Sequence, residues 1–204
     1  MFKEILYPEQ LAITQILSIF SRDFYLAGGT AIALQLGHRK SIDFDLFSGK
    51  EINNSKILKT LKEKGLSIDR ILVDNKGEEL TLIISGVKIT FLYYPFDIVC
   101  SEQFEGISLP NLSILGSMKF YTLGRRGKWK DYVDIYFLFH AGYTLTTLSL
   151  IARSLFAGGY NEKLLREQLC YYDDIDMSEQ VEYMRHGPSD TQVKEFLSSV
   201  AISQ

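Results

Sequence analysis

The chain has 204 residues, 46% of them hydrophobic, and its 22 lysines and arginines against 25 acids give a formal net charge of −3. This composition can bury a core in one compact domain or two small lobes. It excludes a globally basic nucleic-acid-binding protein, so any contact with RNA needs a local patch. Two distant cysteines and three histidines that form no cluster argue against a disulfide framework and a structural zinc site.

The N-terminal segment predicts an amphipathic helix and no targeting sequence. Pro8 suits a first helical position, and apolar residues at helical spacing extend the predicted helix to residue 21. Glu4 and Glu9 are unlike the basic and apolar regions of a signal peptide, and no apolar run approaches the length of a membrane span. We therefore expect a cytoplasmic protein that makes no membrane contact.

The stretch over 24–47 predicts a strand, a glycine turn, a helix and a second strand. A short apolar run over 24–26 precedes Gly28-Gly29-Thr30, and a helix over 30–36 ends at Gly37 as its C-cap. The glycines let the backbone approach a ligand, and the start of the helix offers unpaired N–H groups and a positive dipole end. The start of this helix is therefore suited to bind an anion.

Two acids lie on the second strand of this stretch. Successive side chains of a strand point to opposite faces, so Asp43 and Asp45 project together. The alternate residues Ile42, Phe44 and Leu46 are expected in the core. Adjacent carboxylates repel each other and lose hydration, and a divalent cation between them offsets this cost most simply. We expect Mg²⁺ at these two acids and a nucleoside triphosphate beside it.

Either half of this motif alone would be an ordinary loop or a solvated strand face, but the two together favour a function. The string GGTAIALQLGHRKSIDFDLF resembles the AbiEii/AbiGii toxin family of the polymerase-β-type nucleotidyltransferase superfamily. The resemblance implies an NTP- and Mg²⁺-dependent nucleotidyltransferase, a cytoplasmic toxin or abortive-infection effector usually encoded with an antitoxin. Relatives transfer nucleotides, in some cases to tRNA 3′ ends. The residues expected to hold or assist the β- and γ-phosphates are Gly28, Gly29, Thr30, Arg39 and Lys40.

The rest of the chain predicts more sheet and then helices. A helix capped by Asn53-Asn54-Ser55 ends at Gly65, and strands are predicted over 68–73, 80–84 and 87–93. A loop with one short edge strand extends to residue 111. The helices predicted after it span 113–124, 129–141, 148–156, 162–171 and 191–200. We expect an α+β fold, with a polymerase-β-like mixed sheet and flanking helices over 1–111 and a helical bundle lobe over 112–204.

A second group of charges lies over 118–139. Its five cations around a glycine-flanked turn are Lys119, Arg125, Arg126, Lys128 and Lys130. Asp131 and Asp134 follow, three apart and therefore on one helix face. By itself this would be a basic connection whose acids pair with nearby lysines. The order of elements resembles the second characteristic region of the AbiEii family, which implies that Lys119 is the catalytic or triphosphate-binding lysine and that both acids join the active site.

The role of Lys119 follows from the charge that develops on the α-phosphate and the leaving pyrophosphate, which a fixed ammonium and Mg²⁺ stabilise. For Asp131 or Asp134 three roles stay open: general base for an acceptor hydroxyl, orienter of a lysine, or sugar contact.

The third carboxylate typical of the superfamily is absent from the strand over 87–93, where Thr90 stands in its place. Asp97 could supply it, Asp131 or Asp134 could substitute from the helical lobe, or the enzyme is impaired. We favour substitution from the helical lobe, which predicts a site in a cleft between two lobes.

Three hypotheses follow for the function. The leading one is a nucleotidyltransferase toxin that transfers a nucleotide from an NTP with Mg²⁺ to RNA, such as a tRNA 3′ end, or to a protein. The second is a catalytically impaired nucleotide-binding or regulatory module, which the missing strand acid motivates. The third is a structural subunit whose helical lobe docks a partner.

Overall fold

The chain forms two compact units and passes between them within helix α2 (Gly28–Leu36). Unit 1 comprises Met1–Ile5, Ile32–Lys40 and Asn111–Gln204, and unit 2 comprises Leu6–Ala31 and Ser41–Pro110. The computed structural model describes residues 1–123, 125 and 127–203. The expected boundary after residue 111 stays a prediction.

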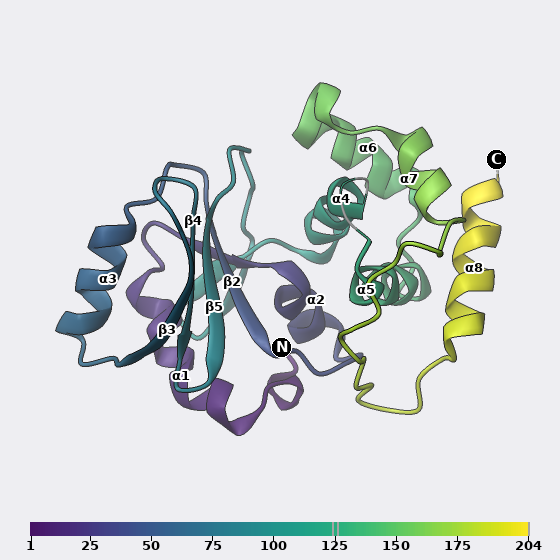
Figure 1. Cartoon of the computed structure of the whole chain (residues 1–204). Coiled ribbons are helices and arrows are strands. Elements are labelled where there is room, and N and C mark those ends of the chain that lie inside the picture. Colours follow the sequence, from purple (N-terminus) through teal and green to yellow (C-terminus); the bar gives the residue numbers. More distant parts are fainter. Residues whose placement is uncertain (124, 126, 204) are drawn as a thin grey trace. The chain divides into compact units, whose positions relative to one another are not determined.

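Unit 2 is built on a five-stranded mixed sheet with the strand order β1-β2-β5-β4-β3 (Figure 1). Its strands are β1 (Tyr25–Ala27), β2 (Asp43–Ser48), β3 (Ile68–Asn75), β4 (Glu79–Ile84) and β5 (Val87–Tyr93). β2 and β5 are parallel, whereas every other neighbouring pair is antiparallel. The turn between β4 and β5 has positive φ at both Ser85 and Gly86, which matches the twist that a two-residue hairpin requires.

Helices α1 (Pro8–Ile19) and α3 (Asn54–Glu63) lie on the same side of the sheet (Figure 1). The ring of Phe20, the C-cap residue of α1, lies 4.8 Å from that of Phe91 on β5 between centroids. Phe44 on β2 is buried like Phe91, as the strand period requires. Asp43 and Asp45 alternate with this buried set, so they lie on the opposite face.

Two details of unit 2 differ from the sequence prediction. Ile42 is 45% exposed and precedes β2, so the expectation that it enters the core is wrong. The single edge strand expected before residue 111 is also wrong, because β6 (Glu102–Phe104) and β7 (Ile107–Leu109) form a separate two-stranded sheet. Glu105 and Gly106, both at positive φ, make the tight turn between these strands.

Unit 1 is helical. Besides the second part of α2 it contains η1 (Lys3–Ile5), α4 (Leu112–Leu123), α5 (Trp129–His140), α6 (Leu145–Phe156), η2 (Ala157–Gly159), α7 (Glu162–Gln168) and α8 (Asp190–Ile202). A Cβ added at Gly116 of α4 would lie 3.0 Å from Leu148 and 3.2 Å from Leu138, so the glycine lets α4 pack closely on α5 and α6. α6 begins three residues earlier than predicted, because Thr144 caps it. Gly124, the predicted end of α4, lies outside the described residues.

Among the residues that the structure describes, no single helix is long and apolar enough to cross a membrane. Trp129–His140 and Leu145–Gly159 reach the necessary length and composition together, but only as a pair bent by 119°.

Candidate functional site

The Asp45 carboxylate lies against the first turn of α2. Its Oδ2 occupies the space that a Cβ on Gly28 would take, and Gly28 has a φ of +69°. A glycine is therefore required here both for the backbone conformation and for the close approach of the carboxylate. The helix begins at Gly28 instead of the predicted Thr30, so both glycines belong to its first turn.

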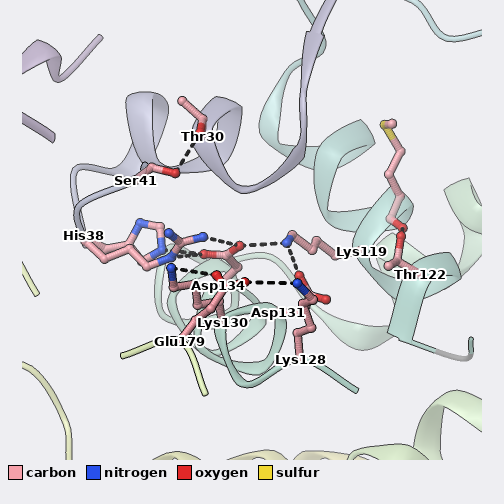
Figure 2. Close-up of polar contacts among 12 residues, drawn as sticks. Thr30, His38, Ser41, Lys119, Thr122, Lys128, Lys130, Asp131, Asp134 and Glu179 are labelled. Atoms are coloured by element: carbon pink, nitrogen blue, oxygen red, sulfur yellow. Dashed lines mark hydrogen bonds and ion pairs between the residues drawn. The ribbon is translucent and has the colours of Figure 1, made fainter. Parts of the chain in front are cut away.

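Thr30 links α2 to the acidic strand. Its side chain is buried, and its hydroxyl lies 2.7 Å from the Ser41 hydroxyl (Figure 2). The Thr30 hydroxyl also donates a hydrogen bond to the Asp43 carbonyl. These bonds fix the first turn of the helix against the start of β2. The assignment of Thr30 to phosphate binding stays a prediction.

The parallel register of β2 and β5 places a lysine, not an acid, beside the strand carboxylates. Lys88 is the Cα partner of Asp43, and Thr90 is the partner of Asp45. The Lys88 Nζ lies 2.5 Å from Oδ2 of Asp43. The sequence analysis considers Thr90 on this strand and assigns no role to Lys88. The signal was present, because Lys88 stands two residues before Thr90 and therefore faces the same way.

The donor set on this face fits Mg²⁺. No group of three or more His, Cys, Asp or Glu side chains within the described part of the chain could hold a metal ion. Mg²⁺ nonetheless commonly binds through one or two carboxylates together with substrate phosphates and water. The ammonium of Lys88 beside Asp43 shows that the face accepts a cation, and the space at Gly28 admits the Asp45 carboxylate. The assignment of the metal to these acids stays a prediction.

Unit 2 also contains a pocket of about 830 Å³ beyond the carboxyl ends of β2 and β5. Ser48 and Tyr93 from the strand ends line it together with Phe20 and Ile57 from the helix-covered face. Asp97, one of the residues considered for the missing third carboxylate, is exposed and lines this pocket.

In unit 1, Asp134 lies at the centre of a buried charged cluster. Arg39 donates from Nε to one carboxylate oxygen at 2.8 Å and from Nη2 to the other at 3.0 Å. His38 Nε2 lies 2.9 Å from Oδ1, and Lys119 Nζ lies 2.9 Å from Oδ2 (Figure 2). Asp134 has no exposed surface. Lys119 also forms an ion pair with Asp131, so the predicted proximity of this lysine to both acids is observed.

The opposite charges of this cluster offset the cost of removing each of them from water. Desolvation opposes the charge on Asp134, but Arg39 and Lys119 outweigh it and hold the pKa of this carboxyl well below its usual range. Burial likewise acts against the Lys119 ammonium, yet the attraction of Asp131 and Asp134 raises its pKa. Burial lowers the pKa of His38, whose neutral ring therefore donates its Nε2 proton to the carboxylate.

A C-terminal segment that sequence reasoning left without a role contacts the basic turn. Glu179 pairs with Lys128 at 3.0 Å and Lys130 at 2.9 Å, and these lysines lower its pKa to about 2 although burial acts in the opposite direction. Backbone bridges join Lys128 to Asp176 and Arg39 to Tyr183.

The remaining predicted cations have other surroundings. Arg125 lies over the ring of Tyr121 at 3.5 Å, and Lys40 donates to the Glu4 carbonyl at 2.7 Å. Arg126 is outside the described residues. The phosphate contacts expected of Arg39 and Lys40 stay predictions.

Comparison with known proteins bears on the family resemblance and on the fold. Residues 12–99 match the family model described as the nucleotidyl transferase AbiEii toxin of type IV toxin–antitoxin systems. This match confirms the AbiEii resemblance. Asp43, Asp45 and Lys88 lie inside the matched AbiEii region, whereas Lys119, Asp131 and Asp134 lie beyond it. An uncharacterised protein of Aquifex aeolicus (strain VF5) is 28% identical over 168 residues, which are 80% of this chain and 81% of that protein.

Two solved structures share the fold. MenT4, a nucleotidyltransferase toxin from Mycobacterium tuberculosis H37Rv, has a TM-score of 0.59 at 11% identity, covering 95% of this chain and 82% of MenT4. JHP933 from Helicobacter pylori has a TM-score of 0.51 at 15% identity, covering 95% of this chain and 88% of JHP933. The predicted α+β nucleotidyltransferase fold is therefore confirmed.

Proposed function

We propose that this chain is a toxin that transfers a nucleotide from an NTP, with Mg²⁺, to a hydroxyl of RNA such as a tRNA 3′ end. The observation that carries the proposal is the placement of Asp43 and Asp45 on one face of β2, with Asp45 against the first turn of α2, inside the AbiEii-matched region. A cognate antitoxin and action in the cytoplasm belong to the same proposal.

The first turn of α2 supplies the anion-binding half of the site. Its backbone N–H groups at Gly28, Gly29 and Thr30 have no partner within the helix and are suited to the nucleotide phosphates, with Arg39 and Lys40 as further phosphate contacts. Asp43 and Asp45 would hold Mg²⁺, which when bound neutralises charge on the phosphate oxygens.

In the proposed reaction an acceptor hydroxyl oxygen attacks the α-phosphorus of the NTP. A new oxygen–phosphorus bond forms, the bond from the α-phosphorus to the bridging oxygen breaks, and pyrophosphate leaves with the electron pair. The hydroxyl proton passes to a base, for which Asp131 is our candidate. Asp134 is assigned to orienting Lys119, because it is wholly buried and its oxygens already accept from three side chains. That Lys119, Asp131 and Asp134 act on the nucleotide held at Asp43 stays a prediction.

The test incubates the purified chain with each α-labelled NTP, Mg²⁺ and total RNA containing tRNA. We expect label in RNA for at least one NTP, and a loss of about 10²–10³-fold in Asp43→Ala and Asp45→Ala. Glu63→Ala is the matched control, because it removes an exposed acid from α3 and should leave transfer unchanged. Absence of labelled acceptor with every NTP, or undiminished labelling and growth inhibition in both aspartate variants, would refute the proposal.

A second candidate function, a nucleotide-binding module without turnover, is favoured by Thr90 in place of an acid and by Lys88 beside Asp43. It predicts heat of NTP binding in calorimetry with no release of pyrophosphate. Pyrophosphate released in step with RNA labelling would exclude it.

A further inference from the structure

Lys88 and Asp43 form a charge pair across two neighbouring strands of unit 2. Their Cα atoms are partners in the parallel register, and Nζ lies 2.5 Å from Oδ2. The two side chains are 36% and 23% exposed. Six residue pairs in register already join β2 to β5, so the strands need no ion pair to stay together, and a pair this exposed adds little stability.

The neighbouring strands offer hydroxyl groups on the same face. Thr90 stands opposite Asp45, and its hydroxyl lies 3.3 Å from the Thr81 hydroxyl on β4. The Thr81 hydroxyl donates a hydrogen bond to the Glu79 carboxylate at 2.7 Å. β5 thus presents a cation and a hydroxyl to the strand acids, at the place where a carboxylate would be needed to hold a second metal ion.

We infer that Lys88 occupies one cation position of the acidic site, so that the site takes a single divalent cation and the lysine contributes the remaining positive charge to the nucleotide phosphates. A metal ion bound to Oδ2 of Asp43 would lie close to the ammonium and be repelled by it. A tethered ammonium instead holds that position without an ion from solution. The inference rests on the proposed function for its phosphate ligand, but its charge arrangement can be measured without turnover.

The first test measures the binding of Mn²⁺ alone to the full chain by calorimetry at neutral pH. We expect one ion per wild-type chain and no binding by Asp43→Asn. Lys88→Met should bind Mn²⁺ about tenfold more tightly, because it removes a unit charge about 4 Å from the ion. Lys88→Arg keeps the charge and should bind as wild type, and Lys62→Met, exposed on α3, is the matched control.

A second measurement concerns stoichiometry. The double variant Lys88→Met with Thr90→Asp exchanges the strand cation for an acid, and we expect it to bind two Mn²⁺ ions per chain. Two ions bound by the wild type, one bound by the double variant, or an unchanged Mn²⁺ affinity in Lys88→Met would each overturn the inference. Circular dichroism and thermal unfolding verify that each variant is folded.

Transfer activity separates the inference from the proposed function. If wild type labels RNA, Lys88→Met should lower labelling about a hundredfold and Lys88→Arg should restore most of it. If no NTP yields product while the Mn²⁺ results hold, the transfer proposal fails and the charge arrangement stands. Transfer that proceeds equally in wild type and Lys88→Met would refute the inference alone.

Discussion

The two acidic clusters contain the same residue types in opposite surroundings. Asp43 and Asp45 are half-buried on one face of β2, where Lys88 is close to Asp43. Asp134 has no exposed surface and receives contacts from Arg39, His38 and Lys119. A carboxylate saturated by side chains of its own chain holds structure, whereas one on an accessible face can exchange its cation for a metal ion. Position in the fold, more than residue type, therefore decides which of these acids is suited to bind a metal ion.

The largest effect that tests this comparison is on folding. Asp134→Ala should lower the free energy of unfolding by about 3–5 kcal/mol, because it leaves the buried Arg39 without its carboxylate and Lys119 with Asp131 alone. Urea unfolding measures it, with Asp173→Ala, which removes an exposed acid of the same unit, as the control. A loss under about 1 kcal/mol, no larger than for an exposed pair, would show that Asp134 has no structural role.

The next effect concerns the close approach at Gly28. Gly28→Ala should reduce transfer about a hundredfold, because its Cβ displaces the Asp45 carboxylate. Gly65→Ala is a matched control, since Gly65 has a φ of +72° and no atom within 4 Å of the added Cβ. Both variants carry the backbone strain of about 1–2 kcal/mol, so only the difference between them reports on Asp45. Equal activities would mean that Asp45 needs no such approach.

A smaller effect is expected in the pH dependence of the free energy of unfolding. The pKa of His38 is lowered on folding, so the folded state binds fewer protons than the unfolded state just below pH 6.5. The stability that His38 contributes is complete above pH 6.5 and is lost as the pH falls through the folded pKa. Asp134 adds a further loss below pH 3.8, since its pKa is also depressed. His38→Gln should flatten the first slope in urea unfolding, and an unchanged slope would contradict the assignment.

The smallest effect is expected at Glu179. Glu179→Gln removes the partner of Lys128 and Lys130, but the carboxylate is 35% exposed. Exposed ion pairs contribute about 0–1 kcal/mol, so urea unfolding should shift within that range. A loss comparable with that of Asp134→Ala would place Glu179 among the structural acids of unit 1.

Local patterns predicted much of this molecule. Alternation in residues 42–47 gave the shared face of Asp43 and Asp45, and Gly37 ends α2 at a φ of +65°, as a C-cap glycine should. The segment after Pro95 predicts only one short edge strand, because strands of three residues such as β6 and β7 are too short to show a period.

Partners distant in sequence were beyond such reasoning. His38 and Arg39 meet Asp134 across 96 and 95 positions, and Glu179 meets Lys128 across 51. Which acid pairs with which cation depends on how the helices pack, and the local periodicity of the sequence does not indicate it. Lys88 is different, because the two-residue period of a strand already predicts that it lies on the same face as Thr90.

The parallel pairing of β2 with β5 also has a kinetic consequence. Parallel neighbours need a long crossover, here filled by α3, β3 and β4, so Asp43 and Lys88 meet only across 45 positions of chain. Contacts of such high separation form slowly and late. During synthesis one edge of β2 stays unpaired until β5 has left the ribosome, which exposes this strand to misassembly in the nascent chain.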